Sequence, residues 1–454
     1  MIYDVAVIGT GPAGYVFALR VKSQGLSVCA IEKDDTLGGV CLNVGCIPSK
    51  TYLHYTELKS LIEEQKNLLG IGDGELNFLE MKQRKGQVVE SLVAIVRSLL
   101  KQNGIDVVRG VASVASPTTI KVIQDGKRVE VSAKNIVIAT GSESIALPFL
   151  PFDEKVIVSS TGALDFNKAP SSLLVVGAGA IGCELASVYA RLKSKVTVVE
   201  LLPTICPGLD SDLQRGLQSA LKKQGIEFFL LTQVTGAKKL EDGVEVTIKG
   251  KEELSKKFDA VLVAIGRKPL THDLGLDKLG VKLTAKGFIQ VDANFRTNIE
   301  NIYAIGDVIE GPMLAHKASE EAMVVADYIA GKTSSIDYMT IPNVIYTNPE
   351  CATVGLTEEE VKNLGVDYKV GKSFLKGNPR AKATGYEMGF VKVIADKNSD
   401  LLLGMHILSP HASELISFGM LALFKKATVK ELASLAFPHP TLSEAIKEAC
   451  MMVA

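Results

Sequence analysis

Two cysteines five residues apart are the residues of this sequence whose type and spacing most directly indicate chemistry. Cys41 and Cys46 lie in the segment GGVCLNVGC at residues 38–46, shortly after an apolar run that ends in Glu32. A structural zinc site needs a further pair of ligands with similar spacing, and the sequence contains no second cluster of that kind. We therefore predict that Cys41 and Cys46 form a redox-active disulfide and that neither holds a metal.

A regular α-helix would keep these two cysteines too far apart for a disulfide. Residues five apart on an ideal helix have α-carbons roughly 8 to 9 Å apart, whereas a disulfide needs less than about 7 Å. We therefore predict a helix that is distorted between the two cysteines, with Asn43 and Gly45 relaxing the backbone. The other five cysteines are scattered, and we expect each to be a small buried hydrophobe: Cys29, Cys183, Cys206, Cys351 and Cys450.

A histidine near the C-terminus is the second candidate for chemistry. His439 lies between Pro438 and Pro440, which confine its backbone to extended or turn geometry. A rigidly held imidazole suits proton transfer near neutral pH, although the residues alone leave a purely structural role open. Glu444 closes a Thr441-x-x-Glu444 capping box. One of its carboxylate oxygens could hold the His439 ring while the other caps the helix.

Two glycine-rich turns recur in the sequence and are expected to position these groups. Residues 4–14 and 172–182 each consist of an apolar run that leads into G-x-G-x-x-G. In both copies a helical stretch, a second apolar run and an acid follow, and Glu32 and Glu200 each lie 18 residues after the third glycine. The glycines are Gly9, Gly11 and Gly14 in the first copy and Gly177, Gly179 and Gly182 in the second.

This repeated pattern is typical of a dinucleotide site. The first glycine allows a tight turn, the second lets the backbone approach a pyrophosphate, and the third lets the helix pack on the strand. The helix start offers N–H groups and partial positive charge to the phosphates, and the acid accepts hydrogen bonds from a ribose. No cation follows Glu200, so NAD is favoured over NADP. Two such sites predict electron exchange between two dinucleotides, a flavin and a nicotinamide.

The repeat also predicts the domain organisation. We expect an α/β protein with two Rossmann-like dinucleotide-binding domains, at residues 1–142 and 143–268, and a C-terminal α+β domain at 338–454. Residues 269–337 form a central segment between them. Within these bounds we expect a polar helical insertion over 51–103, exit strands at 137–141 and 261–266, an apolar run at 303–307, strands around 341–354 and 389–394, and helices over 412–426 and 441–451.

Composition and charge exclude several classes of protein. Among 454 residues, 47% are apolar and 22% are charged, which suffices for large cores. With 50 Lys and Arg against 51 Asp and Glu, the formal charge is −1, so we expect no nucleic-acid partner. Seven cysteines are too few for a disulfide scaffold and fit a reducing compartment.

Neither a targeting segment nor a membrane span is expected. Residues 1–8 run directly into the first glycine turn without a basic region or a cleavage site. The longest uncharged stretch in the glycine-rich middle, residues 169–183, is shorter than the roughly 20 residues that a membrane helix needs. We therefore expect a cytoplasmic protein, or a mitochondrial matrix protein in a form already trimmed.

Taken together, the cysteine pair, the two dinucleotide motifs and the His439 segment resemble the flavin disulfide reductase family, class I of the pyridine nucleotide-disulfide oxidoreductases. The similarity runs essentially end to end and includes residues 41–50, 313–318, 344–350 and 439–444. Lipoamide-oxidising members match most closely. The resemblance implies an NAD-dependent, FAD-containing enzyme that oxidises protein-bound dihydrolipoamide to lipoamide through a redox-active disulfide and reduces NAD⁺ to NADH.

The resemblance also implies roles for individual residues. Cys41 would be the thiol that exchanges with the substrate, and Cys46 would face the flavin. Lys50 would lie by the flavin ring and pair with Glu184. The FAD site would comprise Gly9, Gly11, Gly14, Glu32, Gly38, Gly39, Lys50, Ala112, Thr140, Gly141, Ser142, Asp307, Met313, Leu314, Ala315 and His316. The NAD site would comprise Gly177, Gly179, Ala180, Ile181, Gly182, Glu184, Glu200, Val234 and Gly266.

Further implications concern the assembly. The first domain would bind FAD, the central segment would complete the FAD site, and residues 338–454 would form the dimerisation domain of a homodimer. His439 of the partner subunit, oriented by Glu444, would be the acid/base. The expected partners are the lipoyl domains and acyltransferase core of a 2-oxo acid dehydrogenase complex, or the lipoyl protein of glycine cleavage.

Three alternatives stand beside this prediction. A glutathione reductase is disfavoured because no cation follows Glu200, and a mercuric reductase because Cys450 has no vicinal cysteine partner. A non-catalytic NAD-binding flavoprotein would have no reason to hold the cysteine pair and His439 together. Three positions depart from the family pattern: Val40 stands where Thr is usual, Ala322 where Gly is common, and Phe437-Pro438 where smaller, more polar residues precede the histidine.

Overall fold

A computed structural model of the chain describes residues 2–72 and 74–454. By their contacts, these residues form two compact units, each assembled from three separate stretches of chain. The first unit runs up to Thr51, from Leu79 to Ile145 and from Gly266 to Ile336. The second unit comprises Tyr52–Phe78, Ala146–Ile265 and Asp337–Ala454. The division into four domains at residues 142, 268 and 337 stays a prediction.

A largely parallel sheet forms the centre of the first unit. Its first strand is an apolar run in which Val5, Ala6 and Val7 are fully buried, as expected for a strand covered on both faces. In spatial order the described strands are β3 (Asp106–Arg109), β2 (Val28–Glu32), β1 (Ile2–Ile8), β6 (Lys127–Ile138), β5 (Thr119–Gln124) and β4 (Val111–Ser116), and β17 (Ile302–Ala304) pairs with β6.

The carboxyl edge of this sheet gathers the predicted FAD residues. Strands β1, β2, β3, β6 and β17 pair in parallel, so they all end at this edge. The glycine turn therefore follows β1, Glu32 ends β2, residues 139–142 follow β6 and residues 305–307 follow β17. In open α/β sheets, ligands bind at this edge.

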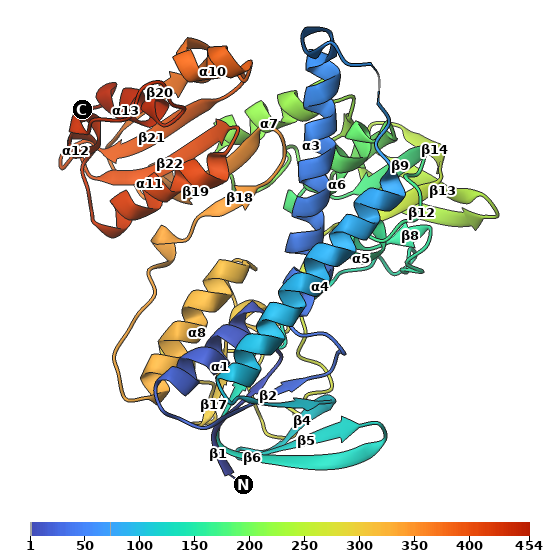
Figure 1. The fold of residues 1–454 in the computed structure, drawn as a ribbon, viewed down its shortest axis with the longest axis vertical. Helices are drawn as coiled ribbons and strands as arrows, with labels where there is room; N and C mark the ends of the chain where they lie inside the picture. The colour runs from blue at the N-terminus through green and yellow to red at the C-terminus, as the bar shows by residue number, and fades with distance from the viewer. Residues whose placement is uncertain (1, 73) are drawn as a thin grey trace. The chain divides into compact units, whose positions relative to one another are not determined.

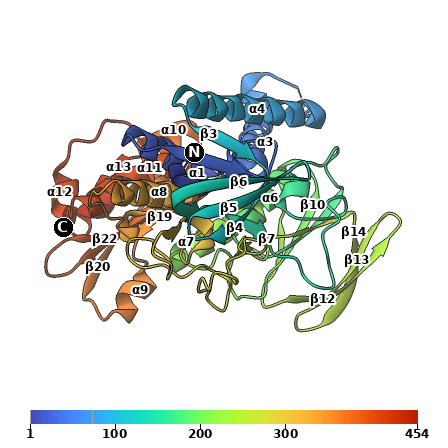
Figure 2. The ribbon, with the colours of Figure 1, turned by 90° about the horizontal axis from the view of Figure 1, so that it is seen from below.

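Helices cover this sheet and carry the cysteine segment. Helix α1 (Pro12–Ser23) lies beside α8 (Ala315–Ile329), as Figure 1 and Figure 2 show. The long helices α3 and α4 confirm the predicted polar helical insertion. The remaining elements are α2 (Gly39–Val44), α3 (Cys46–Leu69), α4 (Phe78–Gln102), the 3-10 turn η1 (Gly306–Val308), and the paired strands β7 (Ser142–Ser144) and β16 (Arg267–Pro269). From Tyr52 onward, α3 belongs to the second unit.

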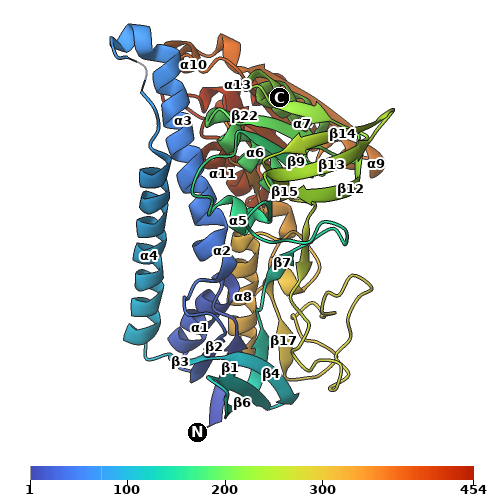
Figure 3. The same cartoon turned by 90° about the vertical axis from the view of Figure 1, so that its right-hand side faces the viewer.

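The second unit begins with a parallel sheet that repeats the first motif. Its described strands are β11 (Glu227–Phe229), β10 (Lys195–Val199), β9 (Ser172–Val176), β15 (Ala260–Val263) and β8 (Ile157–Val158), in spatial order. Its helices are α5 (Ser160–Ala163), α6 (Ala180–Arg191) and α7 (Ser211–Lys223). An antiparallel ribbon, visible in Figure 3, is formed by β12 (Gln233–Leu240), β13 (Gly243–Lys249) and β14 (Glu253–Phe258).

An antiparallel sheet forms the C-terminal part of the same unit. Its described strands are, in order, β18 (Asn343–Ile345), β19 (Glu350–Gly355), β22 (Leu402–Ser409), β21 (Phe390–Asp396) and β20 (Tyr368–Phe374). The associated helices are η2 (Tyr338–Thr340), α9 (Glu358–Asn363), η3 (Leu375–Gly377), α10 (Pro379–Thr384), α11 (Ala412–Phe424), α12 (Val429–Ser434) and α13 (Glu444–Met451). The expected α+β character of this region is confirmed. The last helix begins at Glu444, three residues later than predicted.

Alternation along β21 and β22 gives this sheet two different faces. Val391, Val393 and Met405 belong to the apolar core shared with α11 and α13. Because successive side chains of a strand point to opposite faces, Lys392 and His406, which are register partners, lie on the other face. That face carries a cluster of buried charges.

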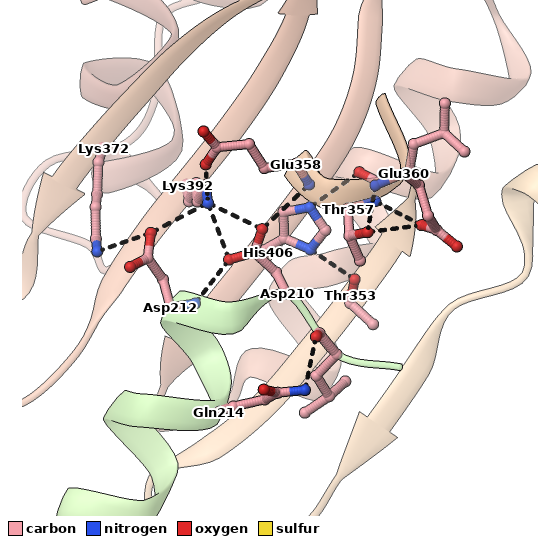
Figure 4. A network of polar contacts seen from close by, with 12 residues as sticks. Asp210, Asp212, Gln214, Thr353, Thr357, Glu358, Glu360, Lys372, Lys392 and His406 are labelled. Carbon is pink, nitrogen blue, oxygen red and sulfur yellow. Dashed lines mark hydrogen bonds and ion pairs between the residues drawn. The ribbon is translucent and has the colours of Figure 1, made fainter. Parts of the chain in front are cut away.

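Figure 4 shows this cluster, which connects α7 to the C-terminal sheet. Lys392 is 1% exposed, and its Nζ lies 2.9 Å from both Asp210 oxygens, 3.1 Å from Asp212 and 2.6 Å from Glu358. Asp210 is also the N-cap of α7, since its carboxylate accepts the Asp212 N–H. One lysine thus links the start of a helix to a strand 182 residues away. The sequence contained no signal for this cluster.

Candidate functional site

A break in the helix brings the two cysteines together, as predicted. Helix α2 ends at Val44 and α3 begins at Cys46, with Gly45 between them at φ −131° and ψ −107°. A Cβ at Gly45 would lie 2.9 Å from the Val40 carbonyl oxygen, so glycine suits this close approach. Asn43 does not relax the backbone, contrary to expectation, because its side-chain amide donates to two carbonyls at the start of α2. The break is therefore at Gly45.

Both cysteines are half-buried thiols in this structure. The pKa of the Cys41 thiol lies above its ordinary value, first because of a hydrogen bond with the Cys46 side chain and then because of burial. The nearby charge of Lys50 acts in the opposite direction. Because a thiolate is the reactive form, chemistry at this pair needs a base or a cation that lowers the cost of the charge.

The first glycine turn has the geometry that a dinucleotide site requires. Gly9 adopts φ +102°, and a Cβ there would lie 2.4 Å from the Ala139 carbonyl oxygen. A Cβ at Gly14 would lie 1.9 Å from the Gly9 carbonyl oxygen, so α1 packs directly on the turn. Gly11 is the N-cap of α1, and no described side chain caps its N–H groups. These groups fit an anion such as a pyrophosphate.

The second glycine turn repeats this geometry in the second unit. Gly177 adopts φ +100°, and its Cβ would lie 2.5 Å from the Ala264 carbonyl oxygen. A Cβ at Gly182 would lie 2.1 Å from the Gly177 carbonyl oxygen. Around Gly179, the N-cap of α6, no described atom lies within 4 Å of the Cβ position, which leaves room for a phosphate. The two turns therefore fit one dinucleotide each.

The two acids at the ends of β2 and β10 support their own glycine turns. Glu32 Oε2 accepts the Thr10 N–H at 2.9 Å and the Thr10 hydroxyl at 2.5 Å. Glu200 Oε2 accepts the Ala178 N–H at 2.7 Å. The middle residue of each turn is thus tied to the acid of the following strand. Ribose recognition by these acids stays a prediction.

A cavity of about 480 Å³ borders the first site. Glu32 at the end of β2 and Arg109 at the end of β3 line it, together with Arg97 and Leu100 of α4. It lies at the carboxyl edge of the sheet, beside Glu32, the acid predicted to bind the ribose. Its size and position suit the nucleoside half of a dinucleotide.

Among the other predicted FAD residues of the first unit, Ser142 contacts Asp307. Its Oδ2 accepts the Ser142 hydroxyl at 2.6 Å, and Ser142 Oγ in turn accepts Arg267 Nε–H at 2.8 Å. Burial lowers the pKa of Arg267, which the nearby Asp307 charge opposes. Arg267 was missed by the sequence analysis, although it directly follows the exit strand and Gly266.

Other predicted FAD residues frame the same edge. Gly38 and Gly39 adopt positive φ, and a Cβ at Gly39 would lie 2.7 Å from Gly11 Cα, so the cysteine segment packs on the first glycine turn. Helix α8 starts at Ala315 with Leu314 as N-cap, and no side chain of the described chain caps it. Of the other members, Ala112 lies in β4, and Thr140 and Gly141 follow β6. Met313 and His316 lie around the start of α8.

The predicted NAD residues lie in the second unit, except Gly266. Glu184 is buried, and its Oε1 accepts the Tyr346 N–H at 3.0 Å. Lys50 belongs to the first unit, so its implied pairing with Glu184 stays a prediction. Val234 is buried in an apolar core, so it can meet a ligand only through its backbone. Ala180 and Ile181 form the first turn of α6.

His439 and Glu444 form a hydrogen-bonded pair. His439 Nδ1 lies 2.9 Å from Glu444 Oε1, and Glu444 Oε2 accepts the Thr441 N–H at 2.8 Å. The predicted contact of one oxygen with the ring is thereby confirmed, whereas the other oxygen accepts the Thr441 N–H without closing a capping box on the helix. Thr441 is not the helix N-cap, because its hydroxyl donates to the Pro438 carbonyl and Ser443 occupies that position.

The exposure of this pair suits proton transfer to an external substrate. The His439 side chain is 68% exposed, and its Nδ1 is engaged, so Nε2 is the nitrogen left for exchange. The pKa of Glu444 lies below its ordinary value, first because of the Thr441 backbone hydrogen bond and then because of His439. Glu444 therefore stays ionised and keeps the ring oriented.

The five remaining cysteines are buried, as expected. They are not all isolated, because Cys183 Sγ and Cys206 Sγ lie 3.6 Å apart beside the Ala178 carbonyl oxygen. Among the described residues, no group of three or more His, Cys, Asp or Glu could hold a metal ion. Within the same residues, no helix has the length and apolarity to cross a membrane.

Fold and site together define an oxidoreductase with two dinucleotide sites and a thiol pair. Residues 3–322 match the pyridine nucleotide-disulphide oxidoreductase family, and residues 341–450 match the dimerisation domain of that family. The chain belongs to this family, and the predicted family and fold class are confirmed.

Several relatives are similar over the full chain. Dihydrolipoyl dehydrogenase of Trypanosoma brucei brucei is 46% identical over 459 residues, covering 99% of this chain and 96% of the relative. Mitochondrial dihydrolipoyl dehydrogenase of Pisum sativum is 45% identical over 456 residues, covering 99% and 91%. The crystal structure of LpdA from Mycobacterium tuberculosis matches with a TM-score of 0.93 and 27% identity over 100% of both chains.

Proposed function

We propose that the protein oxidises protein-bound dihydrolipoamide to lipoamide and reduces NAD⁺ to NADH, with FAD and the Cys41–Cys46 pair as its redox centres. The observation that carries this proposal is the helix break at Gly45, which places two thiols in hydrogen-bonding contact beside a dinucleotide turn. Full-length relatives named dihydrolipoyl dehydrogenase, at 46% and 45% identity, support the substrate. They agree with the enzyme and the cofactors that the sequence implied.

The chemistry at the cysteines is disulfide exchange. A substrate thiolate attacks Cys41 Sγ of the oxidised pair, so a mixed disulfide forms while the Cys41–Cys46 bond breaks and Cys46 leaves as a thiolate. The second substrate thiolate then attacks the substrate sulfur of the mixed disulfide, which releases cyclic lipoamide and leaves Cys41 as a thiol or thiolate. Two electrons and two protons thus leave the substrate.

Proton removal is assigned to His439 of the partner subunit. Its Nε2 accepts the substrate thiol proton, which makes the nucleophile that exchange requires. Glu444 accepts the Nδ1 hydrogen and keeps the ring in that tautomer. Lys50, whose charge acts on the cysteine pair, favours the thiolate form.

The cofactor sites are assigned to the two glycine turns. FAD would be held by the turn of Gly9 to Gly14, by Glu32 and by Asp307, and NAD by the turn of Gly177 to Gly182 and by Glu200. FAD, when bound, supplies an acceptor for the electron pair of the reduced cysteines and a hydride donor to NAD⁺. The residues after Glu200 carry no cation, which supports NAD over NADP.

A homodimer and a lipoyl-bearing partner complete the proposal. The dimerisation-domain match supports a second copy as partner. Phe418, Leu421 and Phe424 on α11 are 41%, 56% and 64% exposed in one chain, an apolar surface that a second copy would cover. The lipoyl domains and acyltransferase core of a 2-oxo acid dehydrogenase complex, or a glycine-cleavage lipoyl protein, would supply the substrate. The compartment is the cytoplasm or the mitochondrial matrix, and the name of the pea relative, which says mitochondrial, supports the second.

Replacement of either redox cysteine tests this function. Cys41→Ser or Cys46→Ser should abolish NAD⁺ reduction by dihydrolipoamide while FAD stays bound, because the glycine turn is unchanged. Cys450→Ser, at a buried cysteine outside the site, is the matched control and should keep wild-type turnover. Steady-state rates with dihydrolipoamide and with glutathione disulfide, each with NAD and NADP partners, form the readout.

Full turnover in a Cys41→Ser variant would refute the disulfide mechanism. Preference for glutathione disulfide and NADPH would instead favour the glutathione reductase alternative. A spectrum separates the non-catalytic alternative: partial reduction by a dithiol should produce the long-wavelength charge-transfer band of a thiolate against the flavin. Absence of that band in a flavin-containing protein would favour a binding module.

A further inference from the structure

A fully buried ion pair lies in α8, outside the residues assigned to either cofactor. Lys317 and Glu321 are one helical turn apart, both side chains are 0% exposed, and Nζ lies 2.9 Å from Glu321 Oε1. Removing two charges from water costs free energy that their mutual attraction repays only when further hydrogen bonds satisfy them. The remaining bonds of this pair therefore indicate its purpose.

Both members of the pair bind the same residue of the neighbouring turn. Lys317 Nζ donates to the Gly306 carbonyl at 3.1 Å, and Glu321 Oε2 accepts the Gly306 N–H at 2.7 Å. Gly306 adopts φ +78°, and a Cβ there would lie 3.4 Å from the Cβ atoms of Ala13 and Ala318. The pair thus satisfies both buried backbone groups of a glycine at the carboxyl end of β17.

The next residue is Asp307, which a second cation fixes from the other side. Arg267 donates from Nε to Ser142 Oγ at 2.8 Å and from Nη2 to the Ser142 carbonyl at 2.6 Å. Ser142 donates its hydroxyl to Asp307 Oδ2 at 2.6 Å. The backbone before Asp307 is therefore held by buried polar contacts and one oxygen of its carboxylate by a partly buried one, which leaves Oδ1 for a ligand.

Lys317 also fixes the start of its own helix. It is the third residue of α8, whose first N–H groups have no side-chain cap among the described residues. The bond from Lys317 to Gly306 therefore sets the distance between this uncapped helix start and Asp307. These are two of the features that the FAD site was expected to use.

We propose that Lys317 and Glu321, together with Arg267 acting through Ser142, are positioning residues of the flavin site. They hold Asp307 and the N-terminus of α8 in one fixed arrangement before the cofactor arrives. The assignment rests on the proposed function, since it takes FAD as the ligand of this edge. An apolar pair would leave the Gly306 N–H without a partner and its carbonyl with only the longer bond from the Ile309 N–H, at 3.3 Å, which explains why charges are kept there.

The test is Lys317→Met in the full-length holoprotein, with release of FAD as the first readout. The loss of a charged hydrogen bond to Gly306 should speed FAD release, followed by free-flavin fluorescence after dilution, by at least about 10-fold. The visible circular dichroism of the bound flavin should also change. Hydrogen exchange of the segment around residues 303–312 should rise in both the holoprotein and the FAD-depleted protein.

Lys392→Met is the matched control. Lys392 is 1% exposed and also neutralises buried carboxylates, but it lies in the second unit. This variant should lower stability without changing FAD release or the flavin spectrum. If the loss of any buried lysine had the same general effect, FAD release and the flavin spectrum would change alike in both variants. That result would overturn the proposal.

Ser142→Ala keeps the proposal testable if Lys317→Met does not fold. It removes the link between Arg267 and Asp307, and should speed FAD release by a smaller factor than Lys317→Met. Wild-type release rates in both Lys317→Met and Ser142→Ala, or in Ser142→Ala alone when Lys317→Met cannot be obtained, would overturn the positioning role while leaving the proposed function intact. A wild-type protein that neither retains FAD nor oxidises dihydrolipoamide would instead refute the proposed function, and this role with it.

Discussion

Glu444 divides its two carboxylate oxygens between the His439 ring and the Thr441 backbone N–H. The backbone bond fixes the carboxylate relative to the start of α13, and the carboxylate then fixes the exposed imidazole. An exposed histidine would otherwise sample several rotamers. Two ordinary hydrogen bonds therefore give a surface side chain the orientation that proton transfer needs.

His406 contrasts with His439, because it is completely buried. Its Nδ1 lies 2.6 Å from Thr353 Oγ1 and its Nε2 lies 3.1 Å from the Leu356 carbonyl oxygen. Burial lowers its pKa to about 4, and the Lys392 charge acts in the same direction, while Asp210 opposes both. The ring is thus neutral at physiological pH and serves the core of the second unit.

A pH dependence of stability follows from this histidine. Between about pH 6.5 and pH 4 the unfolded chain binds the His406 proton and the folded chain does not, so stability should fall by about 3 kcal/mol as the pH falls through that window. Urea unfolding, followed at several pH values, measures the slope. His406→Gln, which keeps a polar group but does not titrate, should flatten it.

His272→Gln is the control for that measurement, since this side chain is 56% exposed. Its slope should equal that of the wild type. If His406→Gln and wild type lose stability in parallel between pH 6.5 and pH 4, the buried ring is not responsible. The Asp210, Lys392 and Glu360 charges that act on His406 are present in all three proteins.

At the scale of elements, the two glycine turns are the best-defined features. In each turn the first and third glycines have no space for a Cβ, whereas the second belongs to an uncapped helix start. The sequence spacing alone predicted these strand–turn–helix units, because the steric demand is local. The same contacts occur in both units, so the two glycine turns adopt the same geometry.

Substitution of the third glycines should separate the two sites. Alanine at Gly14 or at Gly182 would place its Cβ 1.9 or 2.1 Å from the carbonyl oxygen of the first glycine, so the helix must move away from the turn. We expect Gly14→Ala to lose FAD. Gly182→Ala should keep FAD and raise KM for NAD⁺ by about 10-fold or more, as for a lost charged hydrogen bond.

The flavin absorbance of the purified protein measures FAD retention. The rate of dihydrolipoamide oxidation at increasing NAD⁺ concentration measures KM for NAD⁺. Gly86→Ala in α4 is the matched control, because no described atom lies within 4 Å of its Cβ position. It should retain both cofactors at wild-type levels. Loss of FAD from Gly182→Ala, or wild-type behaviour of both turn variants, would contradict the assignment of the two turns.

Local features could be predicted from the sequence, whereas contacts between residues far apart in the chain could not. The helix break at Gly45 and the shared use of Glu444 follow from spacings of five residues. Arg267 and Lys392 were missed because their partners lie 125 and 182 residues away. The N-cap of α13 was misplaced, because Thr441 turned to the Pro438 carbonyl and left that role to Ser443.

At the scale of the whole molecule, the chain distributes one reaction over two units and, in our proposal, two copies. The two redox cysteines, Gly306 and Asp307 belong to the first unit, and the His439–Glu444 pair belongs to the second. The match of residues 341–450 to a dimerisation domain supports a histidine that serves the cysteines of the other copy. An interface between copies is then part of the active site.

Complementation between two inactive variants tests that arrangement. Cys41→Ser lacks the exchange thiol, and His439→Gln should retain about 1% of wild-type turnover or less because it lacks the base. When both chains are co-expressed, a mixed dimer contains one site with an intact cysteine pair from one chain and an intact histidine from the other. Random pairing gives half mixed dimers, so turnover should recover to about one quarter of wild type.

The separately purified variants, mixed without exchange of subunits, are the control and should stay inactive. A different affinity tag on each variant allows the mixed dimers to be isolated. Half of the wild-type rate is expected for them, because one of their two sites is intact. If His439 instead served the cysteines of its own chain, no recovery is expected. Each chain would then lack either the Cys41 thiol or the His439 base. An inactive mixed dimer that still retains FAD would therefore place His439 with the cysteines of its own chain.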